Sequence, residues 1–373
     1  MIEKPAVYFL LLLLIFPALS PPVSAELKEV GAKAAILMTE NGEIVFEQNI
    51  NERLAIASTT KIMTALLVLE SGRDPDEEFI VDPDAIKVEG TSMGLREGDA
   101  VSLRALCWGI LLESGNDAAN AAAVRVAGSV PGFAALMNEK AAGLGLGNTH
   151  FENPSGLDSE GHYSSALDMA RLANYALKNE AFLEICSSRT GRASFGSPPY
   201  DRSMNNHNRL LKELDGCIGV KTGYTQKAGR CLVSAAERDG MRLLCVTLSC
   251  PDDWDIHKSL YRYGFERIEA VPLVPDLSGR RLPVAGGEAN SVGLYTENTG
   301  EKLVLLKKSV PQLKQKIYLP SFVYAPVEKG AALGALRYEL KGEALAETPI
   351  LAAENVAYRQ KTGLWDRIKS WFA

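Results

Sequence analysis

A serine and a lysine near residue 60 have the types and the spacing needed for nucleophilic catalysis. Ser58 and Lys61 lie three residues apart, where a mostly apolar run from 62 to 69 begins. On a helix, residues three apart lie on one face, so the amine can reach the hydroxyl. Burial beside another cation lowers the pKa of a lysine until its neutral amine can take the serine proton. We interpret the pair as nucleophile and base, although a helix cap followed by a solvated lysine has the same spacing.

Two polar motifs further along the chain suit the rest of an acyl-transfer site. Ser114-Gly115-Asn116 separates two expected buried helices, 102–113 and 117–126, so its polar groups should face Lys61 or a substrate. There they can relay a proton and hold a peptide. Lys221-Thr222-Gly223 is expected on a strand, because strand-like residues precede it and a hairpin follows. At a sheet edge its cation and hydroxyl can bind a carboxylate.

Three similar motifs elsewhere in the sequence are excluded by their surroundings. Ser203-Met204-Asn205 falls in a stretch, 191–208, that we expect to be polar and irregular. Lys361-Thr362-Gly363 has no strand before it. The run from Gly90 to Gly94 has the spacing of a hydrolase nucleophile elbow around Ser92, but a strand must precede such an elbow and a helix must follow it. The sequence after Gly94 does not predict a helix.

The remaining pattern predicts an α+β domain in which helices pack on an antiparallel sheet. Two strands joined by an Asn-Gly turn are expected between 34 and 46, and two more, joined at Asp239-Gly240, between 229 and 249. Helices are expected between them, from Ser58 and over 132–142 and 165–177. A sheet assembled from both ends of a domain, with the helices between, is typical of this class.

Composition and the first residues indicate an exported protein. A formal charge of −6 argues against nucleic acid as a partner. Residues 1–25 begin with charge, continue as an apolar run and end in Val-Ser-Ala, which predicts a secretory signal cleaved after Ala25. The six cysteines are expected to be free thiols, because the hairpin register puts Cys231 and Cys245 on opposite faces. The four histidines form no metal-binding motif, so neither metal nor cofactor is expected.

The C-terminal third differs from the rest of the chain. We expect a catalytic domain at 26–271, a linker near Pro272 to Pro275 and a small all-β domain at 272–355. Residues 356–373 are expected to form an amphipathic helix, with large apolar side chains on one face (Leu364, Trp365, Ile368, Trp371, Phe372). Such a helix suits a membrane interface and would hold the protein at the outer face of the cytoplasmic membrane. The alternative is a helix docked on its own β domain.

From Glu26 to Ile268 the chain resembles the low-molecular-weight penicillin-binding proteins of the serine D-alanyl-D-alanine carboxypeptidase family. The resemblance rests on the three motifs in order and on the runs 90–95, 111–118, 148–157, 162–165 and 219–225. It implies a serine β-lactamase/transpeptidase-like fold, peptidoglycan stem peptides as substrate and β-lactams as covalent inhibitors. It also implies site roles: Ser58 attacks, Lys61 and Ser114 carry protons, and the substrate and its oxyanion are bound by the remaining motif residues (Asn116, Lys221, Thr222, Gly223, Tyr224).

Two rival functions and one departure from the family accompany this resemblance. A β-lactamase of the same fold needs an extra base for deacylation, and Glu160 is the obvious candidate. A membrane-tethered, peptidoglycan-binding scaffold without turnover would not need the intact motifs. Some family members carry an arginine after the last catalytic strand, but none lies between Pro251 and Ile256. The segment 250–257 instead resembles the sporulation-associated members from Gram-positive spore formers.

Overall fold

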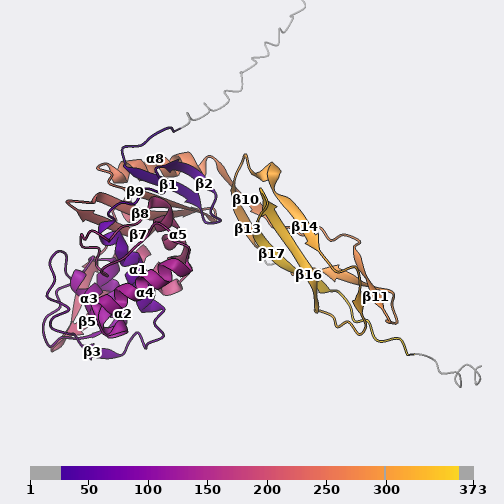
Figure 1. Ribbon diagram of the computed structural model, residues 1–373, viewed down its shortest axis with the longest axis horizontal. Helices are drawn as coiled ribbons and strands as arrows, with labels where there is room; N and C mark the ends of the chain where they lie inside the picture. Colours follow the sequence, from indigo (N-terminus) through magenta and orange to yellow (C-terminus); the bar gives the residue numbers. More distant parts are fainter. Residues whose placement is uncertain (1–26, 298–299, 361–373) are drawn as a thin grey trace, which may run out of the picture.

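The computed structural model describes residues 27–297 and 300–360, which form two bodies joined end to end (Figure 1). The first contains a sheet with helices, and the second contains only strands and one short helical turn. The expected signal segment and residues 361–373 of the expected terminal helix lie outside the described residues. The start of that helix range is not helical, because Val356 and Tyr358 form β-bridges with Val327 and Gly287.

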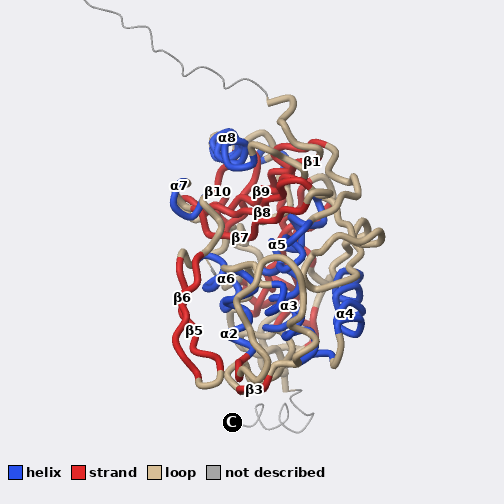
Figure 2. Tube along the Cα trace, turned by 90° about the vertical axis from the view of Figure 1, so that its left-hand side faces the viewer, coloured by secondary structure: helices blue, strands red, loops and turns tan. Residues whose placement is uncertain are grey.

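The first body is built on a five-stranded antiparallel sheet that both ends of the domain share. Its strand order is β2 (Ile44–Gln48), β1 (Ala34–Thr39), β9 (Met241–Leu248), β8 (Gly229–Arg238), β7 (Cys217–Thr225). This confirms the α+β arrangement. Helix α8 (Asp253–Phe265) covers one face, and helices of the segment 61–187 lie on the opposite side (Figure 2). The register places Cys245 opposite Ser234, as expected, and all six cysteines are free.

Helix α1 (Lys61–Leu69) lies at the centre of the first body, with Ile62, Met63 and Leu66 fully buried. The helices around it are α2 (Leu103–Leu111), α3 (Asn116–Ala127), α4 (Val130–Gly143), α5 (Ala166–Ala176), α6 (Glu180–Ser187) and α7 (Leu210–Glu213). The α-helix was expected to begin at Ser58, but it begins three residues later, at Lys61. Ser58 instead lies inside a 3₁₀ turn, Ala57–Thr60, which is tightened when the hydroxyls of Thr59 and Thr60 donate to carbonyls three residues earlier.

The stretch expected to be polar and irregular forms a hairpin of two strands. Strands β5 (Thr190–Gly196) and β6 (Pro199–Asn205) pair with each other and join β3 (Glu78–Ile80) and β4 (Ala100–Ser102) in a second sheet. Ser203 to Asn205 are therefore strand residues. The sequence hides the hairpin because few of its side chains are apolar, and Arg202 packs its guanidinium over the Phe195 ring, 4.2 Å from the ring centre.

The second body is all β, as expected. Its first strand, β10 (Ile268–Pro272), pairs with β13 (Lys302–Leu306). A six-stranded sheet follows in the order β14 (Lys314–Tyr318), β16 (Ala332–Leu340), β17 (Glu343–Ala352), β12 (Ser291–Tyr295), β11 (Arg281–Ala285), β15 (Val323–Tyr324), and the helical turn is Val310–Gln312. The expected linker is partly strand, since Pro272 ends β10, and Leu273 is buried beyond it. None of the helices in the described ranges is long and apolar enough to cross a membrane.

Candidate active site

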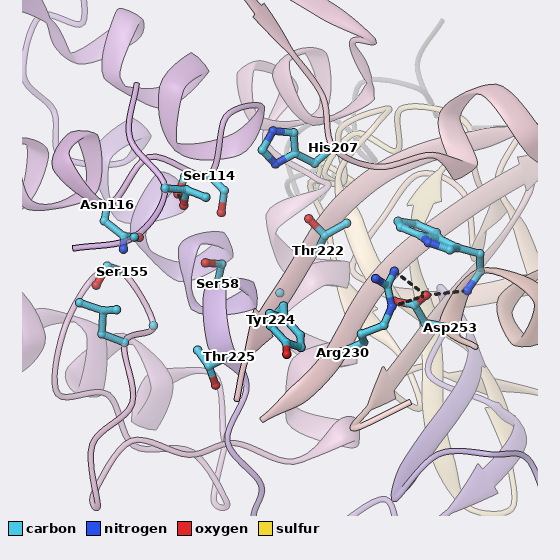
Figure 3. Close-up of a pocket in the computed structure, with 16 residues that line it drawn as sticks. Ser58, Ser114, Asn116, Ser155, His207, Thr222, Tyr224, Thr225, Arg230 and Asp253 are labelled. Carbon is cyan, nitrogen blue, oxygen red and sulfur yellow. Dashed lines mark hydrogen bonds and ion pairs between the residues drawn. The ribbon is translucent and has the colours of Figure 1, made fainter. Parts of the chain in front are cut away.

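The three sequence motifs meet at one cavity of about 390 Å³ between the central helix and the edge of the sheet (Figure 3). Ser58 comes from the 3₁₀ turn before α1, and Ser114 and Asn116 come from the junction of α2 and α3. The third group is on the edge strand β7 (Thr222, Gly223, Tyr224). Lys61 and Lys221 lie just behind this lining and are buried. All eight sequence-predicted site residues are thus brought to one place.

The Lys61 amine contacts three oxygen atoms, one of which belongs to the candidate nucleophile. Its Nζ lies 3.0 Å from the Oγ of Ser58, 2.7 Å from the Oδ1 of Asn116 and 2.6 Å from the carbonyl oxygen of Ser155. The amide and carbonyl oxygens accept but cannot donate. They can take the two N–H groups of a neutral amine, which leaves its lone pair for the Ser58 hydroxyl. The geometry is that of a base already hydrogen-bonded to its nucleophile.

The two acceptors are themselves fixed by neighbouring loops. The Nδ2 of Asn116 donates to the carbonyl of Glu89 at 2.6 Å, so its Oδ1 must face Lys61. The Oδ1 of Asn153 accepts from the backbone N–H of Ser155, Gly156 and Leu157, which folds this loop into a tight turn. The Ser155 carbonyl is therefore held toward the lysine.

Burial shifts the pKa of both lysines toward the neutral form. Desolvation, followed by repulsion from the Lys221 cation, lowers the pKa of Lys61 well below its ordinary value, and Asp117 opposes this only in part. Desolvation also lowers the pKa of Lys221, to about 7. A neutral amine beside a serine at physiological pH is what the base role requires.

The turn that carries Ser58 is held in an unusual conformation. Ala57 has φ +48°, in the left-handed region that non-glycine residues rarely adopt. The loop at Gly156 presses on this turn so closely that a Cβ at Gly156 would lie 2.0 Å from the Ala57 carbonyl oxygen. Ser114 has φ +60° as well. Ala57 precedes Ser58 and Ser114 lines the cavity, so both strained positions belong to the site, which points to function rather than to stability.

The edge of β7 offers a backbone N–H to the cavity. Gly223 packs so closely that a Cβ there would lie 3.1 Å from the backbone nitrogen of Ser58. Tyr224 lies opposite Arg230, and the Arg230 carbonyl accepts from Cys250 on the far side of β8. Since a strand residue points its N–H and C=O the same way, Tyr224 and Arg230 form a non-hydrogen-bonded pair, and the Tyr224 N–H faces the free edge. The backbone nitrogens of Ser58 and Tyr224 thus flank one site, as an oxyanion hole requires.

The loop from Gly90 to Gly94 is a wall of the cavity and not a nucleophile elbow. Asp117, 2% exposed, accepts hydrogen bonds from the backbone N–H of Met93, Gly94 and Leu95 and from the Ser92 hydroxyl. The Ser92 hydroxyl is therefore occupied. Thr91 donates to the carbonyl of Ser114 at 2.6 Å, which fixes the Ser114 backbone beside the cavity.

The structure adds residues to the site that the sequence motifs did not identify, among them Ser155, His207 and Arg230. Ser155 contributes its carbonyl, and the Asn-Pro-Ser-Gly run around it was a visible turn signal. His207 lines the cavity 3.7 Å from the Glu113 carboxylate, and its pKa is lowered by burial and by Lys221. Arg230 also lines the cavity. Neither His207 nor Arg230 belongs to a motif that the sequence analysis recognised.

Two other predictions can be compared with the structure. Glu160, the candidate deacylation base of a β-lactamase, is exposed and does not line the cavity. Within the described ranges, no group of three or more His, Cys, Asp or Glu side chains could hold a metal ion.

Comparison with known proteins agrees with the site. Residues 21–252 match the family model of D-alanyl-D-alanine carboxypeptidases, and residues 277–358 match that of the C-terminal domain of penicillin-binding protein 5. The chain is 32% identical over 363 residues to the D-alanyl-D-alanine carboxypeptidase DacF of Bacillus subtilis, covering 93% of this chain and 92% of that protein. It is also 32% identical to DacC of Escherichia coli, over 94% and 91% of the two chains.

Solved structures agree in fold with both bodies. Penicillin-binding protein 5 from Haemophilus influenzae matches with a TM-score of 0.71 and 28% identity, over 89% of this chain and 99% of its own. The Streptomyces K15 DD-transpeptidase matches with a TM-score of 0.60 and 31% identity, over 64% and 98%. The chain therefore belongs to the family of serine-type D-alanyl-D-alanine carboxypeptidases that act on peptidoglycan.

Proposed function

We propose that this carboxypeptidase removes the terminal D-alanine of pentapeptide stems through an acyl-enzyme on Ser58. The observation that carries the proposal is the hydrogen bond between the Lys61 amine and the Ser58 hydroxyl, with both remaining amine contacts made to pure acceptors. The Ser58 proton passes to neutral Lys61 as Oγ attacks the carbonyl carbon between the two D-alanines. The N–H groups of Ser58 and Tyr224 stabilise the oxyanion.

Collapse of this intermediate needs a proton on the leaving amine. The proton taken by Lys61 reaches the D-alanine nitrogen through the Ser114 hydroxyl, the C–N bond breaks, and D-alanine leaves. Water then attacks the ester carbonyl with Lys61 again acting as base, and Ser58 regains its proton. Asn116 holds the peptide, while Lys221 and Thr222 attract its carboxylate.

The decisive test is a comparison of two substrates on purified residues 26–373. We expect steady D-alanine release from diacetyl-L-Lys-D-Ala-D-Ala, and with penicillin one equivalent of rapid acylation followed by slow turnover. Penicillin is an acylating analogue, and Glu160, the candidate for the extra deacylation base of a β-lactamase, does not line the cavity. Fast, repeated hydrolysis of penicillin without D-alanine release would favour the β-lactamase alternative. Acylation with no turnover of either would favour the scaffold.

The nucleophile is tested with a matched pair of serine variants. Ser58→Ala should abolish both labelling by a fluorescent penicillin and D-alanine release, because among the described residues Ser58 has the one hydroxyl that is hydrogen-bonded to the Lys61 amine. Ser92→Ala removes the hydroxyl of the elbow-like motif, which contacts Asp117 at 2.6 Å, and should keep its labelling. Labelling that persists in the first variant and disappears in the second would reassign the nucleophile.

We also propose that the enzyme is exported and works at the outer face of the cytoplasmic membrane. Support comes from the signal pattern at 1–25 and from the apolar face that the sequence predicts after residue 363. A sporulation-associated role stays a prediction from the segment 250–257.

A further inference from the structure

The cavity contains one cation that the mechanism above does not use. Arg230, near the start of β8, lies opposite Tyr224 and keeps 40% of its side chain exposed. It lines the same cavity as Ser58 and Thr222. Figure 3 shows its guanidinium on the sheet side of the cavity, near Thr222 and Tyr224 and across from Asn116. A ligand that fills the cavity therefore meets Arg230.

A buried carboxylate holds this guanidinium in position. The Nε and Nη2 of Arg230 donate to one oxygen of Asp253, at 3.1 and 2.9 Å, and the backbone N–H of Trp254 donates to the same oxygen. Asp253 also lines the cavity but is only 2% exposed, so the guanidinium is the more accessible member of the pair, with 40% of its side chain exposed. Among the described residues Nη1 has no hydrogen-bond partner. Donors therefore remain for an anionic group.

The established site has a specific need for such a cation. The substrate of a carboxypeptidase ends in a carboxylate. Lys221 can pair with that carboxylate only while its amine is protonated. Burial lowers the pKa of Lys221 to about 7, so about half of its amines are neutral near that pH, and its Nζ already donates to the carbonyl of Thr222. A guanidinium stays protonated and matches the planar geometry of a carboxylate.

We propose that Arg230, beside Thr222, binds the free C-terminal carboxylate of the stem peptide and so restricts the enzyme to chain ends. The inference rests on the proposed function, because it names the group that recognises that substrate. It also accounts for the departure noted in the sequence. The segment after β9 carries no arginine between Pro251 and Ile256, but it supplies Asp253, which orients an arginine from the neighbouring strand.

The test compares a peptide acid with its amide, so that only carboxylate recognition differs. For Arg230→Gln, kcat/KM on diacetyl-L-Lys-D-Ala-D-Ala should fall about 10- to 100-fold, the usual value of a charge-assisted hydrogen bond. Release of D-alaninamide from the corresponding C-terminal amide should not change. Arg209→Gln is the matched control, because Arg209 lies near the same Trp254 ring, is paired with Glu213 and does not line the cavity.

A second variant distinguishes a loss of carboxylate binding from misfolding. A second reagent tests Arg230 even if the proposed function fails. Asp253→Asn should give a smaller loss, again confined to the acid, because the guanidinium remains but is less firmly held. Equal losses on acid and amide, or no loss on either, would overturn the assignment. If the wild type releases no D-alanine, the proposed function fails, yet Arg230 is still tested by acylation: Arg230→Gln should slow acylation by benzylpenicillin but not by its methyl ester.

Discussion

The lysines of the candidate active site and those of the second, all-β body have opposite surroundings. In the cavity, Lys61 and Lys221 are at most 1% exposed, and no carboxylate within the described residues forms an ion pair with either. In the β body the charges pair at the surface, as Lys316 does with Glu339 at 2.6 Å. Surface pairs contribute at most about 1 kcal/mol, whereas a buried unpaired cation costs stability. Buried lysines without an ion-pair partner therefore distinguish the candidate active site from the β body.

The two bodies are nevertheless packed together through one strand. Alternate residues of β13 point to opposite sides: Val304 and Leu306 pack with the core of the first body, and Leu303 and Leu305 pack with that of the second. The carboxylate of Glu43, in the β1–β2 turn, accepts from the backbone N–H of Leu306 and from the Ser309 hydroxyl. The two bodies are therefore joined by apolar contacts of β13 and by the hydrogen bonds of Glu43.

The largest effect is expected from removing the buried base. Lys61→Ala should lower both the acylation rate and D-alanine release by about 10²- to 10⁴-fold, because the Ser58 proton then has no acceptor. The melting temperature should stay the same or rise, since a desolvated amine has been removed. Thermal unfolding and stopped-flow acylation measure the two.

Lys227→Ala is the control for this comparison. The Lys227 amine is exposed and contacts the Ser159 carbonyl at 3.2 Å, so its loss should leave both quantities unchanged. If Lys61→Ala destabilises the fold strongly and Lys227→Ala does not, the buried lysine serves structure, and the contrast between the two bodies loses its basis.

The second effect is a pH profile set by the two lysines. Acylation requires neutral Lys61, so kcat/KM should rise with pH through the lowered pKa of that amine. Carboxylate binding is assisted by protonated Lys221, so kcat/KM should decline above the Lys221 pKa of about 7. The decline should be up to about tenfold, because Thr222 and Arg230 still contact the carboxylate.

Lys221→Arg separates the two limbs of this profile. An arginine stays charged, so the decline above pH 7 should disappear while the acidic limb remains. In wild type the decline in kcat should lie at higher pH than that in kcat/KM, because a bound carboxylate raises the pKa of the ammonium. A profile that is flat above pH 7 in wild type would show that Lys221 does not titrate there.

The sequence could predict the site residues that lie close together along the chain, but not those brought in by strand pairing. Ser58 and Lys61 are close together in the sequence, as are Ser114 and Asn116, so local spacing was enough to identify each motif. Arg230 reaches the cavity only through the pairing of β7 with β8 and the contact with Asp253.

The fold follows the same rule. The hairpins of the main sheet carried turn signals and apolar runs, and their pairing was predicted correctly. The β5–β6 hairpin was missed because polar and charged residues dominate it, and its strands are stabilised by contacts such as that of Arg202 with Phe195. The 3₁₀ turn at Ser58 was missed because the loop at Gly156, about 100 residues later, presses on it.

The third effect concerns stability and tests whether the bodies can be perturbed separately. Leu336 is fully buried in the β body, and Leu336→Ala should destabilise that body by about 2–5 kcal/mol. D-alanine release at 25 °C should not change, because no residue of the cavity comes from β16. Leu66→Ala, in the core around α1, should cost similar stability and also reduce activity. Calorimetry measures the stability of each variant, and parallel assays measure D-alanine release. A loss of activity in Leu336→Ala would mean that a disturbance of the β body reaches the active site through the contacts of β13.

The smallest effect on catalysis is expected from removing the tail. Residues 361–373 lie outside the described residues, and their sequence predicts a helix with five large apolar side chains on one face (Leu364, Trp365, Ile368, Trp371, Phe372). At about 1.5–3 kcal/mol per fully buried side chain, and less at interfacial depth, these would hold the protein on a bilayer. Truncation after Gln360 keeps the hydrogen bond from the Arg359 N–H to the Gly286 carbonyl, so the β body should stay intact. The truncated enzyme should no longer sediment with anionic vesicles, and its kcat on a small peptide should stay the same. In the full chain, the double variant Trp365→Ser, Trp371→Ser should lose vesicle binding in the same way. Sedimentation that survives truncation, or a loss of kcat, would instead support a helix docked on its own β body, since such a helix stabilises the protein and contributes nothing to attachment.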